Sequence, residues 1–127
     1  MLTLALLLIA QFADDALPTG TYSGVCLYPE AVQARAAPGE LVLCSEATIA
    51  GDHISFGQRG WRTRTRFNGI FEGSRMTVDS VTLPNGRTVA VRGVCEVYFA
   101  DDALSTVACT ATSTRGSMAA NFVVSRI

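Results

Sequence analysis

The stretch from residue 91 to residue 112 constrains the fold of this chain most strongly, because it holds two cysteines at equal distances from one central residue. Cys95 precedes Asp102 by seven residues, and Cys109 follows Asp102 by seven. Both flanks are rich in β-branched and aromatic residues, which favours strands. An antiparallel hairpin that turns at Asp102 would therefore set the two sulfur atoms face to face.

A second hairpin is predicted by Asn85-Gly86, the strongest turn signal in the chain. This turn sets Val78 opposite Gly93. It also sets Met76 opposite Cys95 and Asp79 opposite Arg92. Strand alternation then gives the same apolar face from both turns. The residues predicted to point inward are Met76, Val78, Val89, Val91, Cys95, Val97, Phe99, Val107 and Cys109, and those predicted to point outward are Thr77, Asp79, Arg92, Glu96, Thr110 and Thr112.

Eight short β-rich segments follow one another with mostly short connections. They span residues 21–28, 41–50, 53–56, 61–70, 75–83, 88–99, 104–112 and 118–126, with a short helix possible within the loop 29–39. Closing such strands into a barrel leaves no free edge. We therefore predict an all-β fold, a small eight-stranded up-and-down antiparallel barrel, with a two-sheet β-sandwich as the alternative.

The interior of this barrel is predicted to be filled. Alternation places Trp61, Thr63, Thr65 and Phe67 inside, with Phe99, Met76 and Phe122. Eight strands enclose room for side chains or for one small ligand. Three aromatic residues near strand ends could line a shallow mouth: Tyr22, Tyr28 and Trp61.

Four cysteines without metal-like spacing predict two disulfides and an oxidising compartment. Of the three possible pairings, Cys26–Cys44 and Cys95–Cys109 each close a hairpin, so we expect these two. Cys26 and Cys44 alternate against neighbouring leucines. The first cystine is therefore expected on the outside of the barrel, unless a bulge intervenes.

The first ten residues have the length and apolarity of a signal-peptide core, and Ala13 is the favoured cleavage point. No lysine or arginine precedes this core, so a misassigned start, a short buried helix or an anchor are alternatives. We expect a periplasmic or secreted protein whose single domain spans residues 14–127. Membrane contact is expected only if residues 1–13 are retained.

Catalytic signatures are missing from the sequence. Its one histidine, His53, flanks a turn, and the chain has no Gly-x-Ser-x-Gly elbow and no glycine-rich phosphate loop. The adjacent carboxylates of Asp101 and Asp102 are expected to point apart. We predict a protein that is not an enzyme and has no metal or cofactor. The net charge of −1 gives no overall field that would attract nucleic acid.

A row of arginines is the sharpest candidate for binding. Arg62, Arg64 and Arg66 share the outward face of one predicted strand, and Arg59 lies just before it. Guanidinium groups at strand spacing suit carboxylates, sulfates or phosphates. The predicted function is therefore binding of a protein or an anionic envelope polymer. The alternative is a solvated strand face that only discourages aggregation.

Two other functions remain open. A disulfide between Cys26 and Cys44 would pin the ends of the loop 29–39, with Arg35 at its middle, as in an inhibitor of a secreted protease or lysozyme. The same loop could instead be a lid on one end of the barrel. The third possibility is a carrier of one small ligand inside the barrel.

Size, predicted export and cysteine use are similar to those of small exported eight-stranded barrels with one or two disulfides, which include bacterial lysozyme inhibitors and inhibitors of secreted metalloproteases. The Cys26–Cys44 spacing with Gly60-Trp61 after it resembles the metalloprotease inhibitors. No motif of either family is matched residue by residue, so no site residue follows from the resemblance.

Overall fold

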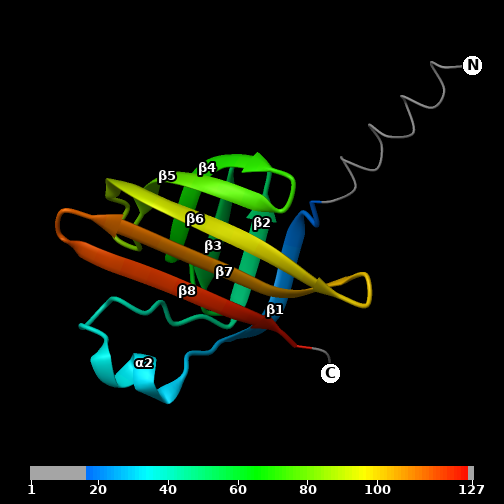
Figure 1. Ribbon diagram of the computed structural model, residues 1–127, viewed down its shortest axis with the longest axis horizontal. Helices are drawn as coiled ribbons and strands as arrows, with labels where there is room; N and C mark the ends of the chain where they lie inside the picture. The colour runs from blue at the N-terminus through cyan, green and yellow to red at the C-terminus, as the bar shows by residue number, and fades with distance from the viewer. Residues whose placement is uncertain (1–16, 126–127) are drawn as a thin grey trace, which may run out of the picture.

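The structure is a computed structural model that describes residues 17–125. Eight strands form a closed barrel in which each strand pairs antiparallel with the next, and β8 pairs with β1 (Figure 1). The predicted up-and-down barrel is thus confirmed, and the sandwich alternative is wrong. The elements are β1 (Gly20–Cys26), α2 (Glu30–Arg35), β2 (Glu46–Ala50), β3 (His53–Gly57), β4 (Arg64–Glu72), β5 (Arg75–Thr82), β6 (Thr88–Ala100), β7 (Ala103–Ser113) and β8 (Gly116–Val124).

The connections between strands alternate between the two ends of the barrel, because consecutive strands are antiparallel. The connections β1–β2, β3–β4, β5–β6 and β7–β8 lie at one end, which we call the mouth end and which is on the left of Figure 1. The connections β2–β3, β4–β5 and β6–β7 lie at the other end, the far end. Strand β1 starts at the far end and β8 runs toward it, so both ends of the described chain leave the barrel there.

The predicted register between β6 and β7 is confirmed. Cys95 lies opposite Cys109, the two form a disulfide, and both are buried. Their hairpin turns through Asp101 and Asp102, whose φ angles of 53° and 63° are typical of a type I′ turn. The turn pairs Ala100 with Ala103, and a register shift between Tyr98 and Phe99 moves the pairing by one residue, so that Cys95 lies opposite Cys109.

The register between β5 and β6 is confirmed only away from the turn. Met76 lies opposite Cys95 and Val78 opposite Gly93, as expected. The prediction that Asp79 lies opposite Arg92 is wrong, because the register shifts between Val78 and Ser80. The hairpin loop spans residues 83–87 rather than two residues, and the irregularity at Asp79 restores the register beyond it.

The core is built around three phenylalanines from β3, β4 and β8. The rings of Phe56 and Phe67 meet edge to face with centroids 5.7 Å apart, and Phe122 lies 6.5 Å from Phe56. All three are fully buried, as is Met76. The predicted inward positions of Phe67, Met76 and Phe122 are confirmed, and the centre of the barrel is packed.

Three residues predicted to point inward are exposed instead. Trp61 and Thr63 lie in the connection before β4, where strand alternation does not apply. Phe99 follows a register shift between Tyr98 and Phe99, and Leu104 is the buried residue at that end. Strand alternation therefore holds only within the regularly paired part of β4 and β6.

The disulfide between Cys26 and Cys44 is present, and both cysteines point into the core. The expected strand 41–50 is broken, because β2 begins only at Glu46. Residues 41–44 instead run beside β8, where the Val42 amide donates to the Ala119 carbonyl at 2.9 Å. This break changes the alternation, so the cystine is internal and Leu43 is external.

The two disulfides are consistent with an oxidising compartment, extracellular or periplasmic. Residues 17–125 contain no helix long and apolar enough to cross a membrane. The predicted signal peptide and its cleavage point at Ala13 lie outside the described residues.

Candidate binding site at the mouth of the barrel

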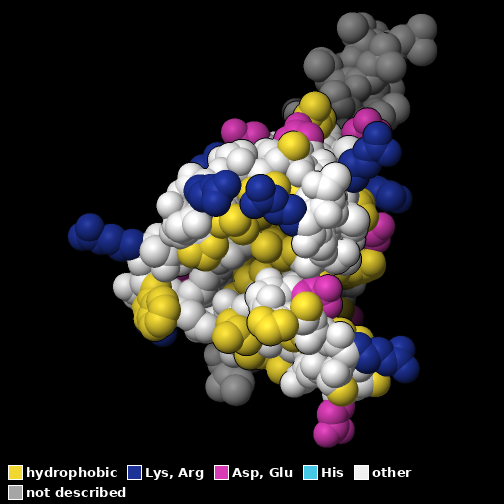
Figure 2. All heavy atoms as spheres, turned by 90° about the vertical axis from the view of Figure 1, so that its left-hand side faces the viewer, with side chains coloured by type: hydrophobic (Ala, Val, Ile, Leu, Met, Phe, Trp, Pro, Cys, Tyr) yellow, Lys and Arg dark blue, Asp and Glu magenta, His cyan; other side chains and the backbone are white. Residues whose placement is uncertain are grey.

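A cavity of about 270 Å³ opens at the mouth end. Figure 2 looks onto this end and shows a hydrophobic hollow with basic side chains around its opening. The cavity is closed below by the packed core, so it is a cup at one end of the barrel and does not run through it.

The cavity walls are aliphatic and come from β5, β6, β7, β8 and the loop after β5. Val81 and Ala111 are buried at its base, whereas Leu83, Val91 and Met118 are only partly buried because they face the opening. These side chains are small or flexible, and the three core phenylalanines do not line the cavity. The space therefore exists because no bulky side chain reaches this end of β5–β8.

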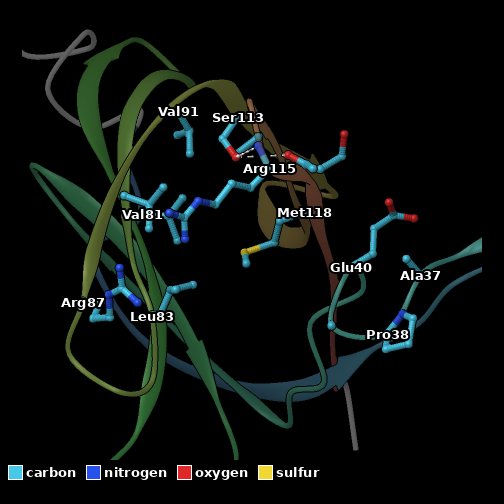
Figure 3. Close-up of a pocket in the computed structure, with 15 residues that line it drawn as sticks. Ala37, Pro38, Glu40, Val81, Leu83, Arg87, Val91, Ser113, Arg115 and Met118 are labelled. Carbon is cyan, nitrogen blue, oxygen red and sulfur yellow. Dashed lines mark hydrogen bonds between the residues drawn. The ribbon is translucent and has the colours of Figure 1, made fainter.

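Two arginines from different hairpins line the same cavity at its rim: Arg87 between β5 and β6, and Arg115 between β7 and β8. Figure 3 shows the Arg115 side chain reaching across the opening toward Val81, with Arg87 beside Leu83. Among residues 17–125, no carboxylate lies within 4.0 Å of either guanidinium. Both groups can therefore donate hydrogen bonds to an anion.

Turn hydrogen bonds fix the backbone under these two arginines. The Arg87 amide donates to Asn85 Oδ1 at 2.9 Å, and the Leu83 amide donates to the Arg87 carbonyl at 2.8 Å. The Arg115 amide donates to Ser113 Oγ at 3.2 Å. The backbone positions of the two arginines on the rim thus follow from local turn chemistry.

The opposite rim is the segment 37–40, which follows α2. The Ala119 amide of β8 donates to the Glu40 carbonyl at 2.8 Å and holds this segment against the barrel. Helix α2 itself has no buried residue. Only the segment after the helix borders the opening, and the Glu40 carboxylate adds one negative charge to that side (Figure 3).

The predicted arginine row lies on the barrel's outer surface. Arg62, Arg64 and Arg66 line a groove of about 610 Å³ that lies over β1–β4 and reaches the end of β5 and the loop after it; we call it the outer groove. Arg64 is paired with Glu46, and Arg66 Nε donates to Asn68 Oδ1 at 2.8 Å. Arg59 lies in the β3–β4 connection and does not line this groove.

Arg35, the other predicted site residue, lies in the last turn of α2. The loop that contains it is pinned by the Cys26–Cys44 disulfide, as expected. A helical Arg35 does not present the extended backbone that a protease-binding loop would need. The tyrosine-lined mouth is wrong, since none of Tyr22, Tyr28 and Trp61 lines the cavity.

Three titratable groups have pKa values shifted by their surroundings: Tyr28, Asp52 and Tyr98, and the hydrogen bond to Glu96 raises the pKa of Tyr98. Burial raises the pKa of Tyr28, whose hydroxyl donates to the carbonyls of Val42 and Ala119. At the far end, a hydrogen bond from His53 lowers the pKa of Asp52, with 2.7 Å between His53 Nδ1 and Asp52 Oδ1. Within the described chain, no group of three or more His, Cys, Asp and Glu side chains is arranged to hold a metal ion.

Arg87 and Arg115 were not predicted from the sequence. Each lies in a connection between predicted strands, and the up-and-down topology puts both connections at the same end. The sequence could have indicated both residues, since each lies in a predicted turn and the antiparallel strand order places the two turns at the same end of the barrel. Comparison with protein-family models, with curated proteins and with solved structures finds no match to this chain.

Proposed function

We propose that this protein is a non-catalytic binding protein, periplasmic or secreted, that holds one small amphiphile in the mouth of its barrel. The apolar part of the ligand packs against Val81, Val91 and Met118. Its anionic head lies between Arg87 and Arg115. The observation that carries this proposal is the aliphatic cup of about 270 Å³ with two arginines on its rim, neither of which has a carboxylate within 4.0 Å among residues 17–125.

The size of the cavity limits the ligand. Ligand pockets commonly measure about 300–1,000 Å³, so this cavity suits a short acyl chain rather than a large ring system. Each methylene group transferred from water into the cup contributes about 0.8 kcal/mol. A medium-length fatty acid anion fits both the apolar wall and the basic rim.

The charge on the rim sets the ligand's orientation. A carboxylate, sulfate or phosphate head would accept hydrogen bonds from Arg87 and Arg115 and would avoid Glu40 on the opposite side. Such charge-assisted hydrogen bonds are worth about 1.5–3 kcal/mol each. An uncharged ligand with the same chain is therefore expected to bind more weakly.

The test is a calorimetric titration with decanoate and with decanol, which share a chain but differ in charge. Decanoate should bind more tightly than decanol. The double variant Arg87→Gln/Arg115→Gln should reduce decanoate affinity to the decanol level and leave decanol binding unchanged. The matched control is Arg75→Gln at the far end, which should change neither. Equal binding of decanoate and decanol to the unsubstituted protein, or no binding, would contradict the proposal.

The outer groove is the second candidate, for an anionic polymer or an acidic protein segment. Its volume of about 610 Å³ and its arginines favour this function, but the pairing of Arg64 with Glu46 reduces the available charge. The test is retention on an anionic matrix. The variant Arg62→Ser/Arg66→Ser should elute at lower salt, and an unchanged elution position would remove this candidate.

A further inference from the structure

We propose that the mouth end docks on an anionic membrane surface, so that the cavity opens directly onto lipid. The role that we give to this docking, delivery of an amphiphile to the cavity, rests on the proposed function. The docking itself rests on separate observations: the separation of charge between the two ends, and the exposed apolar side chains beside the arginines of the basic end. The far end also exposes Ile70, Tyr98 and Phe99, but its connections carry no basic residue.

The charged residues of the connections are separated between the two ends. Connections at the mouth end carry five arginines and two glutamates, whereas those at the far end carry three aspartates and no basic residue. The barrel therefore has a basic end and an acidic end, although the net charge of the chain is only −1. The residues at the mouth end are Arg35, Arg59, Arg62, Arg87, Arg115, Glu30 and Glu40, and those at the far end are Asp52, Asp101 and Asp102.

The mouth end also exposes large apolar side chains. Trp61 is 67% exposed and Leu43 is 75% exposed, and both lie in connections at this end with Leu27 and Val32. Tryptophan is enriched at the level of lipid headgroups, where one part of its ring is apolar and its N–H remains hydrated. Arginine next to exposed Trp and Leu is the composition of surfaces that lie on anionic membranes.

The position of these residues relative to the cavity supports a lipid surface over an acidic protein. Three of the four connections line the opening, and the fourth, which carries Trp61, lies at the same end of the barrel. Figure 2 shows basic and hydrophobic side chains around the opening. A membrane in contact with all four connections would cover the opening. An amphiphile could then pass between the bilayer and the cup without its chain crossing water.

The experiment uses the single tryptophan of the chain, Trp61, as the reporter. The full protein is mixed with vesicles of phosphatidylcholine alone, and with vesicles that also contain phosphatidylglycerol. Anionic vesicles should shift Trp61 emission to the blue, and brominated lipid should quench it. Both effects should weaken at high salt.

Trp61 also separates this docking from attachment through another part of the chain. The described chain begins at the far end, so attachment through a segment before residue 17 would not itself bring Trp61 to the lipid. No quenching of Trp61 with anionic vesicles would overturn the inference, and the basic end would then be a surface for an acidic protein. Equal quenching with neutral vesicles would overturn it as well.

Substitutions at the two ends provide the matched comparison. Arg59→Ser/Arg62→Ser should lower the partition coefficient onto anionic vesicles about 30-fold, from roughly 1 kcal/mol per basic residue near the surface. Arg75→Ser/Arg92→Ser removes the same charge outside the mouth-end connections and should leave partitioning unchanged. An equal loss in both variants would overturn the inference.

These variants also keep the two proposals distinguishable. Arg59 and Arg62 do not line the cavity, so decanoate binding in solution should be unchanged in their double variant. If vesicles quench Trp61 but decanoate does not bind, the docking stands and the proposed ligand is wrong. If decanoate binds but vesicles leave Trp61 unquenched, the docking is wrong and the ligand site stands.

Discussion

Arg64 and Glu46 form an ion pair across the strand that lies between them, with 2.8 Å between Arg64 Nη1 and Glu46 Oε1. The pairing runs over Gly57 of β3, which lies opposite both residues. A Cβ atom at Gly57 would come within 3.0 Å of Arg64 Cγ, so the glycine makes room for this contact. Arg64, the middle residue of the predicted arginine row, therefore has its charge neutralised by Glu46 of β2.

Glu46→Gln should release the charge of Arg64 into the outer groove. Both side chains are about one-fifth exposed, at 23% for Arg64 and 22% for Glu46. Loss of the pair should therefore lower the free energy of unfolding by only about 1 kcal/mol, measured by urea titration. Retention on an anionic matrix should increase. Glu96→Gln is the control, since its partner Arg75 lies 3.7 Å away and outside the groove; equal gains from both variants would argue against a specific effect of Glu46.

Val91→Phe should fill the cup and block decanoate. Val91 is partly buried and lines the cavity, so a larger ring can occupy space that is empty in this structure. We expect loss of decanoate binding in calorimetry with a melting temperature that is unchanged or higher, because added apolar surface is buried. Val91→Ala is the companion variant and should retain binding. Binding that persists in Val91→Phe would place the ligand elsewhere.

Tyr28→Phe should change the stability of the protein in a pH-dependent way. The Tyr28 hydroxyl donates to the Val42 and Ala119 carbonyls, so its removal should cost about 1–2 kcal/mol at neutral pH. Burial raises the folded-state pKa of Tyr28 above its ordinary value of 10.0. The unfolded chain therefore loses this proton first as the pH rises.

The sign of this effect follows from linkage. The contribution of Tyr28 is fully present below the unfolded pKa and is lost as the pH rises toward the folded pKa. The difference in unfolding free energy between the unsubstituted protein and Tyr28→Phe should thus shrink above about pH 10. Urea titrations at a series of pH values measure it. A difference that stays constant across this range would contradict the prediction.

Gly24→Ala should destabilise the barrel where β1 meets β8. A Cβ atom at Gly24 would lie 2.1 Å from the Val123 carbonyl oxygen and 2.7 Å from the Phe122 ring. We expect a loss of about 3 kcal/mol, because backbone and core would both have to shift. Gly51→Ala is the matched control, since a Cβ there meets nothing within 4 Å. Thermal unfolding of both variants measures this difference. Similar melting temperatures would contradict the prediction and would mean that β8 can shift at little cost in stability.

The barrel could be predicted because strand alternation and turn chemistry act locally. The turn near Asp102 predicted the β6–β7 register that the disulfide between Cys95 and Cys109 confirms, and Asn85-Gly86 predicted the β5–β6 register that holds at Met76 and Val78. The errors lie where the backbone becomes irregular: before β4 at Trp61 and after the register shift at Phe99. Alternation gives no information beyond the last paired residue of a strand.

The mouth cavity was harder to predict, since it is defined by the absence of bulk. Val81, Val89, Val91 and Ala111 come from three strands, and the space between them depends on how far the core phenylalanines reach. The difference in charge between the two ends of the barrel was not predicted, for a related reason. A net charge averages over the chain, whereas the direction of each strand decides which end a turn residue joins.

Both ends of the described part of the chain lie at the far end, and this has a practical consequence for measurement. A biotin or an affinity tag attached after Ser125 would fix the molecule to a sensor chip in one orientation. The opening between Arg87 and Arg115 would then point into the flowing solution. Injected vesicles and soluble fatty acids would meet the same uncovered surface.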